Sequence, residues 1–346
     1  MLIQIFNKRN IFIIIVISSI YLSYFYFLNT YSNSLKVIHN ELNTIPVVQI
    51  YYENGEDCVE FIEDGLWQAR EYNRKVILLS KLLKCKTEVE KIGIEFVHVE
   101  DYMEGANDFE KIFPNYEHWS TRRWYELRSF QRWFSLRDYM NHKNISRVMY
   151  EDSDMLLFVD ATIHYHQMFS NYSVVVTKLP KATASPTGSI SYWTKDSITQ
   201  FCNYIKEYYL QGCNNKTWSH PKWYRINNDM YLLQEWLVHK RNIPNAITLD
   251  GGFTTQVGHF PSKNPRHLLV NGTALQIKWI ENLPHITDSA TNATKRLIGV
   301  HFQGGSKLLM KYYTRPSKIM SPEQKHECIC NAIHCRNCFV KSDSVV

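Results

Sequence analysis

Short apolar runs separated by longer, more polar stretches follow one another along the chain after position 44. Strands are expected at residues 45–52, 75–80 and 94–99, and a helix at residues 61–73 lies between the first two strands. Strands that alternate with helices place neighbouring strands parallel in one sheet. The first part of this region therefore predicts an α/β fold.

The second part continues the pattern. Residues 124–140 predict an amphipathic helix, in which Trp133, Phe134 and Met140 recur near helical spacing. Further strand character appears at residues 147–158, where an acidic turn interrupts it, and at residues 173–178, 246–249 and 297–302. Because there is no internal repeat, we expect a single α/β domain with a mixed, mostly parallel sheet flanked by helices.

The first thirty residues have a different pattern. Residues 11–28 are almost wholly apolar or aromatic, which is close to the length that a helix needs to cross a bilayer. Lys8 and Arg9 precede this run, so the positive-inside rule leaves the N-terminus in the cytosol. We expect a cytosolic tail at residues 1–10, a transmembrane signal anchor at 11–29 and a stem at 30–44.

Two alternatives to an anchor are weaker. A cleaved signal peptide has a shorter apolar region and a small-residue cleavage site, and residues 24–33 contain no A-x-A pattern. A buried core helix is disfavoured because nothing polar interrupts the run. The prediction is a single-pass type II membrane protein with its bulk on the lumenal side.

Sequons and cysteines agree with a lumenal body. Five N-x-S/T sequons occur, each weak by itself, and they begin at Asn144, Asn171, Asn215, Asn271 and Asn292. The chain has eight cysteines, for which disulfides are the default in an oxidising compartment, with 105 possible pairings. They are Cys58, Cys85, Cys202, Cys213, Cys328, Cys330, Cys335 and Cys338.

The last four cysteines lie in a separate C-terminal tail at residues 321–346. Their C-x-C-x4-C-x2-C spacing matches no standard zinc finger well, and lumenal thiols usually oxidise, so a disulfide-stapled tail is favoured. A zinc site that also uses His326 and His334 is the alternative.

Composition and charge narrow the class of protein. Of 346 residues, 45% are hydrophobic, 14% aromatic and 21% charged, which excludes a disordered chain. Lys and Arg number 39 and Asp and Glu 33, so the net charge is 39 − 33 = +6. No compact basic stripe accompanies this mild excess, so a nucleic-acid binder is not indicated.

The first candidate for chemistry is the acidic segment that interrupts residues 147–158. Asp152 and Asp154 follow an apolar strand, and ligands of open α/β sheets bind beyond the carboxyl ends of strands. In extended backbone these two side chains share a face and converge on one cation, for which carboxylate oxygens suit Mg²⁺ or Mn²⁺. The alternative is a solvated acidic turn. A calcium hand is excluded, because Met155 and Leu156 follow without further ligands.

The second candidate is the heptapeptide that begins at His301. This histidine stands at the end of a predicted strand, and histidine is a competent ligand for Mn²⁺-like ions. Gly304 follows, and the backbone at a glycine can approach a phosphate closely. Lys307 would supply a positive charge to a diphosphate. The segment does not have the spacing of a Walker loop. A core histidine followed by an ordinary turn is the alternative.

Together, Asp-x-Asp after a strand and a C-terminal H-x-x-G-x-x-K resemble the glycogenin-like retaining glycosyltransferases, which include bacterial lipopolysaccharide galactosyltransferases. The resemblance implies a GT-A-type fold, a nucleotide-sugar donor such as a UDP-sugar, and Mn²⁺ or Mg²⁺ as cofactor. It assigns the metal to Asp152, Asp154 and His301, and the diphosphate to Lys307 and Gly304. The same resemblance places a basic residue of the preceding helix at the sugar nucleotide. Arg132 is our choice, although periodicity does not separate it from Arg128 and Arg137.

Three further positions carry weaker assignments. Gly188, in Thr-Gly-Ser, stands where the family has an Asn-Ala-Gly-type segment that contacts the donor. Asp229, in Asn-Asn-Asp-Met, is the nearest match to an Asp-Gln pair, and we assign it to orienting the acceptor hydroxyl or stabilising oxocarbenium character; an exposed Asp at a helix start is the alternative. Tyr51 or Tyr52 is a candidate for stacking on the base, with core packing as the alternative. The family's Pro-Trp after the lysine is Leu308 and Leu309 here.

These observations predict a metal-dependent glycosyltransferase with its catalytic domain at residues 45–320. It would transfer a sugar from a UDP-sugar to a glycan or glycoconjugate acceptor in the secretory pathway, with retention of configuration, and the Golgi is the usual site for such enzymes, with the ER as the alternative. A catalytically inactive protein that binds nucleotide sugars or glycans on the same fold is the main alternative function. A phosphoryl or nucleotidyl transferase ranks third, because the sequence has one compact acidic cluster.

Overall fold

The computed structural model describes most of the α/β region and little of either end of the chain. The described residues are 23–24, 43–52, 60–113, 120–178, 186–214, 229–239, 246–249, 254–257, 269–270, 273–274, 278–281, 283–287, 293–302, 307 and 310–314. The chain divides into two compact units, Met1–Thr44 and Ile45–Val346. No helix within the described residues is long and apolar enough to cross a membrane, and the predicted anchor lies almost wholly outside them.

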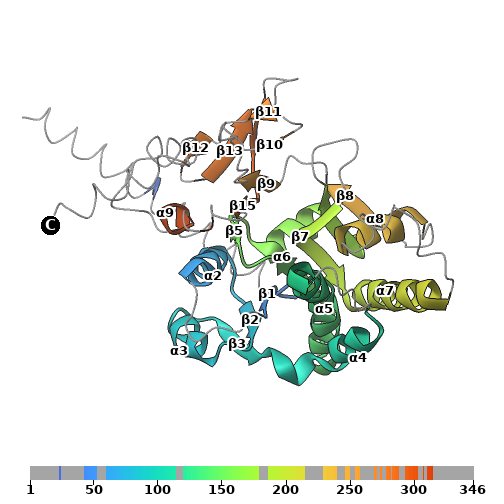
Figure 1. The fold of residues 1–346 in the computed structure, drawn as a ribbon. Helices are drawn as coiled ribbons and strands as arrows, with labels where there is room; N and C mark the ends of the chain where they lie inside the picture. The colour runs from blue at the N-terminus through green and yellow to red at the C-terminus, as the bar shows by residue number, and fades with distance from the viewer. Residues whose placement is uncertain are drawn as a thin grey trace, which may run out of the picture. The chain divides into compact units, whose positions relative to one another are not determined.

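A seven-stranded sheet forms the centre of the second unit (Figure 1). Its strand order is β3-β2-β1-β4-β7-β6-β8, and β7 alone runs antiparallel to its neighbours. The strands are β1 (Val47–Tyr51), β2 (Val76–Ser80), β3 (Glu95–His98), β4 (Arg147–Glu151), β6 (Val174–Lys178), β7 (Pro186–Thr194) and β8 (Ala246–Leu249). This mixed, mostly parallel sheet confirms the predicted fold class.

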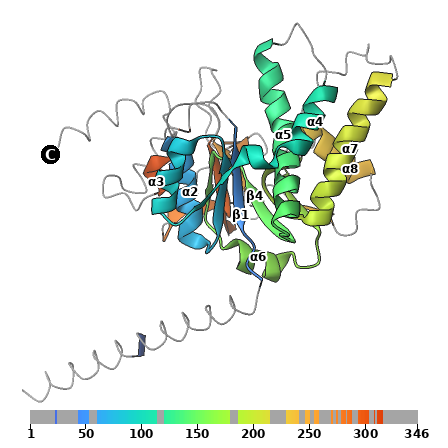
Figure 2. The same ribbon diagram turned by 90° about the horizontal axis from the view of Figure 1, so that it is seen from below.

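Helices cover both faces of the sheet (Figure 2). One face packs on α4 (Glu104–Ile112), α5 (Ser120–His142), α7 (Lys195–Asn214) and α8 (Asp229–His239). The other packs on α2 (Glu60–Tyr72), α3 (Leu83–Lys91) and α6 (Ala161–Met168). Alternate residues of β1 enter the two cores, Val48 the first and Val47 the second, which explains why every residue of this strand is buried.

The helix predicted at 124–140 is confirmed as the longer α5, and it positions much of the site. It buries Leu127, Phe130 and Phe134 in the core beside α4. Asp138 accepts a hydrogen bond of 2.8 Å from the backbone N–H of Gly105, which ties α5 to the start of α4. These contacts fix α5 against α4, and Trp133 of α5 packs on Tyr150 of β4, with ring centres 5.0 Å apart.

A three-stranded sheet continues from the carboxyl end of β4. Its order is β5 (Met155–Leu157), β15 (Gly299–Phe302) and β9 (Thr254–Val257), with β15 antiparallel to β5 and parallel to β9. Gly65 of α2 allows close packing here, since an added Cβ would lie 2.9 Å from the Met155 carbonyl oxygen. The pairing of β5 with β15 brings residues 154 and 301 together.

The remaining short elements lie mainly in the C-terminal third. They are η1 (Val99–Tyr102), β10 (Leu269–Val270), β11 (Thr273–Ala274), β12 (Lys278–Ile280), β13 (Leu283–Thr287), β14 (Thr294–Arg296) and α9 (Lys311–Thr314). Sequence periodicity did not predict these elements. It also missed α3, α4, α6, α7, β7 and β9, of which β7 has weak strand character because it contains Pro186 and Gly188.

Cysteines only partly follow the sequence prediction. Cys85 is disulfide-bonded. Cys202 is a free thiol, fully buried on α7 in the aromatic core, so the expectation that all eight cysteines pair is wrong at this position. The tail at residues 321–346, with its disulfide and zinc alternatives, lies outside the described residues. Of the sequons, Asn144 and Asn171 occupy exposed turns before β4 and β6.

Candidate metal centre and active site

The acidic segment lies at the carboxyl end of β4, as its position in the sequence predicted. The backbone there is a turn, in which the N–H of Met155 donates to the carbonyl of Asp152 at 3.1 Å. The expectation that extended backbone aligns the two carboxylates is therefore wrong. They converge because the turn redirects the chain from β4 into β5.

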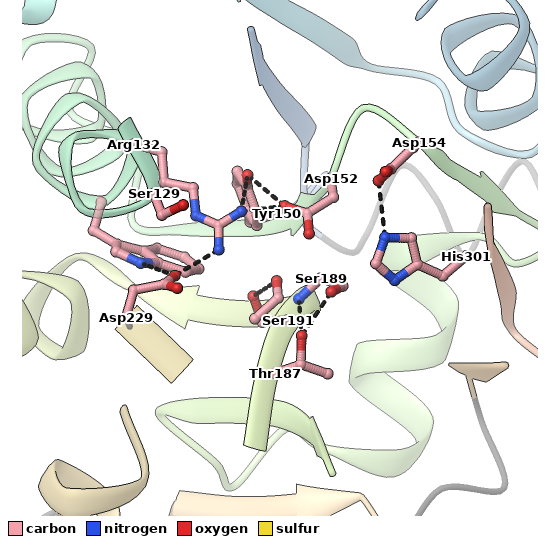
Figure 3. A network of polar contacts seen from close by, with 12 residues as sticks. Ser129, Arg132, Tyr150, Asp152, Asp154, Thr187, Ser189, Ser191, Asp229 and His301 are labelled. Atoms are coloured by element: carbon pink, nitrogen blue, oxygen red, sulfur yellow. Dashed lines mark hydrogen bonds and ion pairs between the residues drawn. The ribbon is translucent and has the colours of Figure 1, made fainter. Parts of the chain in front are cut away.

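Asp152, Asp154 and His301 form a cluster that can hold a metal ion. Each residue offers one ligand atom, and these three atoms lie within 4.8 Å of one another. Nε2 of His301 is 2.9 Å from Oδ1 of Asp154, and the N–H of Phe302 donates to the Asp154 carbonyl at 2.8 Å. Antiparallel pairing of β5 with β15 thus fixes both the backbone and the side chains of this half of the cluster (Figure 3).

Lys307 joins the cluster from beyond β15. Its Nζ lies 3.1 Å from Oδ2 of Asp154 and 4.8 Å from the centre of the Phe61 ring on α2. The side chain is 32% exposed, so its ammonium group can also reach a ligand in solvent. Gly304, the predicted close-approach glycine, lies outside the described residues.

Arg132, our choice among the three arginines of α5, connects Asp152 to Asp229. Its Nη1 donates to Asp152, and its Nη2 donates to Asp229 at 2.5 Å (Figure 3). Arg128 instead lies over the Tyr52 ring, with its Cζ 5.2 Å from the ring centre. Arg137 pairs with Asp138 at 2.6 Å. Among these three, Arg132 is the one that contacts both acidic residues of the site.

Asp229 begins α8, as predicted, but it is only 5% exposed. The alternative of an exposed helix-start Asp is therefore wrong. Its Oδ2 also accepts a hydrogen bond of 3.0 Å from Nε1 of Trp133, the residue next to Arg132. Two adjacent donors of α5 thus hold this carboxylate, which places it in the same network as the metal cluster.

Gly188 lies on β7, where it makes room for Trp133. A Cβ added at Gly188 would lie 2.4 Å from the Trp133 ring, so the position accepts only glycine without movement of its neighbour. Thr187 and Ser189 on either side have hydroxyls 2.6 Å apart, and the Ser189 carbonyl accepts from the N–H of Asp152 at 2.8 Å. In Figure 3 these hydroxyls lie between the Arg132 side and the His301 side of the site.

Glu151 and Gln49 form a buried polar pair behind the turn that sequence reasoning missed. Both are fully buried, and Nε2 of Gln49 donates to Oε1 of Glu151. Burial raises the pKa of Glu151 to about 8, although the hydrogen bond from Gln49 lowers it. The sequence did contain a signal for this pair, because Gln49 and Glu151 are polar residues within two otherwise apolar strands.

Tyr150 is a second residue that the sequence did not single out. Its hydroxyl donates to Oδ1 of Asp152 at 2.8 Å and lies 3.3 Å from Nη1 of Arg132. Tyr51, one of the two candidates for stacking on the base, is 6% exposed and packs edge-on against Phe61. Its neighbour Tyr52 is 7% exposed, so both tyrosines lie in the core at the end of β1.

Electrostatics divide the cluster into paired charges. Burial raises the pKa of Asp154, but the charges of His301 and Lys307 outweigh burial, so the net pKa is lowered to about 2. Burial lowers the pKa of His301, and the Asp154 carboxylate outweighs it, so the net pKa is raised. The same balance holds Arg132 firmly protonated between Asp152 and Asp229. Two carboxylates with a neighbouring imidazole therefore suit a divalent cation that accepts both oxygen and nitrogen ligands.

Comparisons with known proteins add little beyond the site itself. No known family matches the sequence, and no curated protein does. Mouse xyloside xylosyltransferase 1 in its apo form is 8% identical with a TM-score of 0.43, over 61% of this chain and 87% of that chain. A glycosyltransferase involved in the glycosylation of the major capsid of PBCV-1 is 11% identical with a TM-score of 0.37, over 79% and 98%. A likeness this low carries no functional conclusion, which must rest on the residues of the site.

Proposed function

We propose that the protein is a metal-dependent glycosyltransferase that transfers a sugar from a UDP-sugar to a glycan or glycoconjugate acceptor. The observation that carries the proposal is the cluster of Asp152, Asp154 and His301 at the carboxyl end of β4, with Lys307 beside it. This edge of an α/β sheet is where ligands bind. The motifs that supply these residues are those that resemble the glycogenin-like enzymes.

Asp152, Asp154 and His301 would hold Mn²⁺ or Mg²⁺, which neutralises negative charge on the diphosphate leaving group when bound. Lys307 is the residue of this chain that would bind the same diphosphate, since its ammonium group is part exposed and lies 3.1 Å from Asp154. A cation held in this position stabilises charge that grows as the glycosidic bond breaks, and it therefore raises the rate.

Arg132 and Asp229 would act on the transferred sugar and the acceptor. Arg132 is held by two carboxylates, so its guanidinium is oriented before any ligand binds. One oxygen of Asp229 accepts from Arg132 and Trp133, and we assign its carboxylate to orienting the acceptor hydroxyl or stabilising oxocarbenium character. Retention of configuration is part of the proposal through the family resemblance.

The test is UDP-sugar hydrolysis and transfer by the lumenal part, residues 45–346, with and without Mn²⁺. We expect activity that chelator abolishes and that Asp152→Asn, Asp154→Asn and His301→Ala each reduce by at least about a hundredfold. Asp108→Asn is the matched control, because Asp108 is an exposed carboxylate that pairs only with Lys111 in the described structure. Full activity of the Asp152 and Asp154 variants would refute the proposal. Mn²⁺-dependent UDP binding without turnover would identify an inactive nucleotide-sugar-binding protein instead.

We further propose that this domain is lumenal, in the Golgi or the ER, and anchored by residues 11–29. The exposed sequons Asn144 and Asn171 provide the test, because a lumenal domain is accessible to N-glycosylation. Expressed in a secretory host, the full chain should lose mass on treatment with an N-glycosidase, and Asn144→Gln with Asn171→Gln should remove part of that change. A chain that is digested by protease added to intact microsomes would contradict the topology.

A further inference from the structure

Two adjacent aromatic side chains are exposed at the start of α5. Trp124 is 53% exposed and Tyr125 is 73% exposed. In the described part of residues 45–346, the other large apolar side chains with high exposure are not aromatic and come from four different elements, namely Leu83, Met168, Leu210 and Ile280. Neighbouring exposed aromatic side chains form a local apolar surface, and such surfaces are candidates for binding.

This pair is continuous with the candidate active site. Tyr125, Ser129 and Arg132 are spaced by four and three residues on one helix, so they form a single stripe along α5. The Ser129 hydroxyl donates to the Tyr125 carbonyl at 2.9 Å, and Figure 3 shows Ser129 beside Arg132. Desolvation of its hydroxyl by surrounding protein atoms raises the pKa of Tyr125; among the nearby charges, Arg132 lowers this pKa and Asp152, Asp229 and Asp154 raise it.

Two arginines hold the Trp124 ring. The guanidinium carbons of Arg128 and Arg123 lie 5.6 Å and 5.8 Å from the ring centre, within range of cation–π attraction. Arg128 is itself fixed by a hydrogen bond of 2.7 Å to Gln131. The indole therefore has a preferred orientation and is surrounded by hydrogen-bond donors.

These surroundings favour one class of ligand. A pyranose ring has a flat face of C–H groups that packs on an aromatic ring, and a rim of hydroxyls that hydrogen-bonds to polar neighbours. A purely apolar partner would leave the arginines and carboxylates around the pair desolvated without compensation. Tyr125 lies on the same helix face as Arg132, which pairs with Asp229. In Figure 3, His301 lies on the opposite side of Asp152 from Arg132 and Asp229, and Lys307 contacts Asp154, the partner of His301.

We propose that Trp124 and Tyr125 form a platform that binds a pyranose ring of the acceptor glycan. This inference rests on the proposed function, and it names the substrate class that the acceptor side of the site recognises. The energy gained from a ring remote from the reacting hydroxyl would position that hydroxyl at the transferred sugar.

The experiment uses a glycan microarray as its probe, with residues 45–346 labelled and saturated with UDP and Mn²⁺. The glycan with the highest signal is then titrated calorimetrically into wild type and variants. We expect Trp124→Ala and Tyr125→Ala each to weaken glycan binding about tenfold or more, and Trp124→Phe and Tyr125→Phe to weaken it less. Leu83→Ala, which removes an exposed apolar side chain from α3, is the matched control and should bind like wild type.

UDP titration distinguishes the outcomes. If the wild type does not bind UDP with Mn²⁺, the proposed function is refuted, and the acceptor platform, which rests on it, is refuted with it. If UDP binds but the array gives no signal, or if the alanine variants bind the glycan normally, the platform is refuted. Weaker UDP binding in the alanine variants would show that the aromatic pair stacks on the base, which also overturns the proposal.

Discussion

Nε2 of His301 lies 2.9 Å from Oδ1 of Asp154, although 147 positions separate the two residues. The contact depends on β15 pairing with β5, the short strand that follows the acidic turn. It gives Asp154 a basic partner on one oxygen, and Lys307 approaches the other. The protonation of His301 therefore decides whether this half of the cluster can bind a metal.

Mn²⁺ binding should weaken as the pH falls. The pKa of His301 is raised above its usual value by Asp154, and a histidine must be neutral to bind a metal. Below that raised pKa each unit of pH should cost up to about tenfold in affinity, because one proton must leave. Calorimetric titration with Mn²⁺ across the neutral and mildly acidic range measures the slope. His301→Asn should bind more weakly but with a flatter dependence, and an equal slope in both proteins would contradict the assignment.

Arg132→Lys should lose activity, while metal binding is retained. Lysine keeps the charge, but its single ammonium cannot hold Asp152 and Asp229 in the forked geometry of a guanidinium. We expect kcat/KM for transfer to fall by about a hundredfold, as for a misplacement of catalytic groups. Arg137→Lys on the same helix is the control, since Arg137 pairs with Asp138 away from the cluster. Equal losses in the two variants would indicate damage to α5 rather than to the site.

Glu151→Gln should stabilise the protein at neutral and alkaline pH. Burial raises the pKa of Glu151 to about 8, so the folded state holds a proton that the unfolded state releases near its ordinary value. Wild-type stability from this group is complete below the unfolded pKa and is lost as the pH rises to about 8. The glutamine of the variant does not ionise, so its unfolding free energy has no such loss. At pH 7 the variant should therefore be more stable than the wild type by roughly 3 kcal/mol. Denaturant unfolding of both proteins at acidic and neutral pH measures this difference in stability. A difference that does not change with pH would refute the claim that Glu151 is buried in its neutral, protonated form.

Gly188→Ala should destabilise the protein through Trp133. The added Cβ would lie 2.4 Å from the indole, which must move and thereby disturb its hydrogen bond to Asp229. Overpacking of this kind costs roughly 1–3 kcal/mol. In a Trp133→Phe background the smaller ring should reduce the cost, so a double-mutant cycle of unfolding free energies should be non-additive. An additive cycle would mean that Gly188 is required for another reason.

Much of the fold was predictable from local pattern. The strands that became β1, β2, β3, β4, β6, β8 and β15 were expected within a few residues, because each is an apolar run bounded by polar residues. Strand β7 was missed, since it begins with Pro186 and contains Gly188, two residue types that are rare in strands, before the apolar residues Ile190, Tyr192 and Trp193. The helices α3, α4, α6 and α7 were also missed, although α4 and α7 each have an apolar face and a polar face.

By itself, the sequence determined which residue types stand at the ends of strands. Asp152, Asp154 and His301 were identifiable because motifs and strand ends are local features of the chain. Only the tertiary structure decided that Arg132, rather than Arg128 or Arg137, contacts the acidic residues, because all three lie on one helix and their surroundings come from distant segments. It also decided that Asp229 is buried and that Glu151 has a raised pKa. Burial and charge pairing depend on what packs around a residue, and no local pattern contains that information.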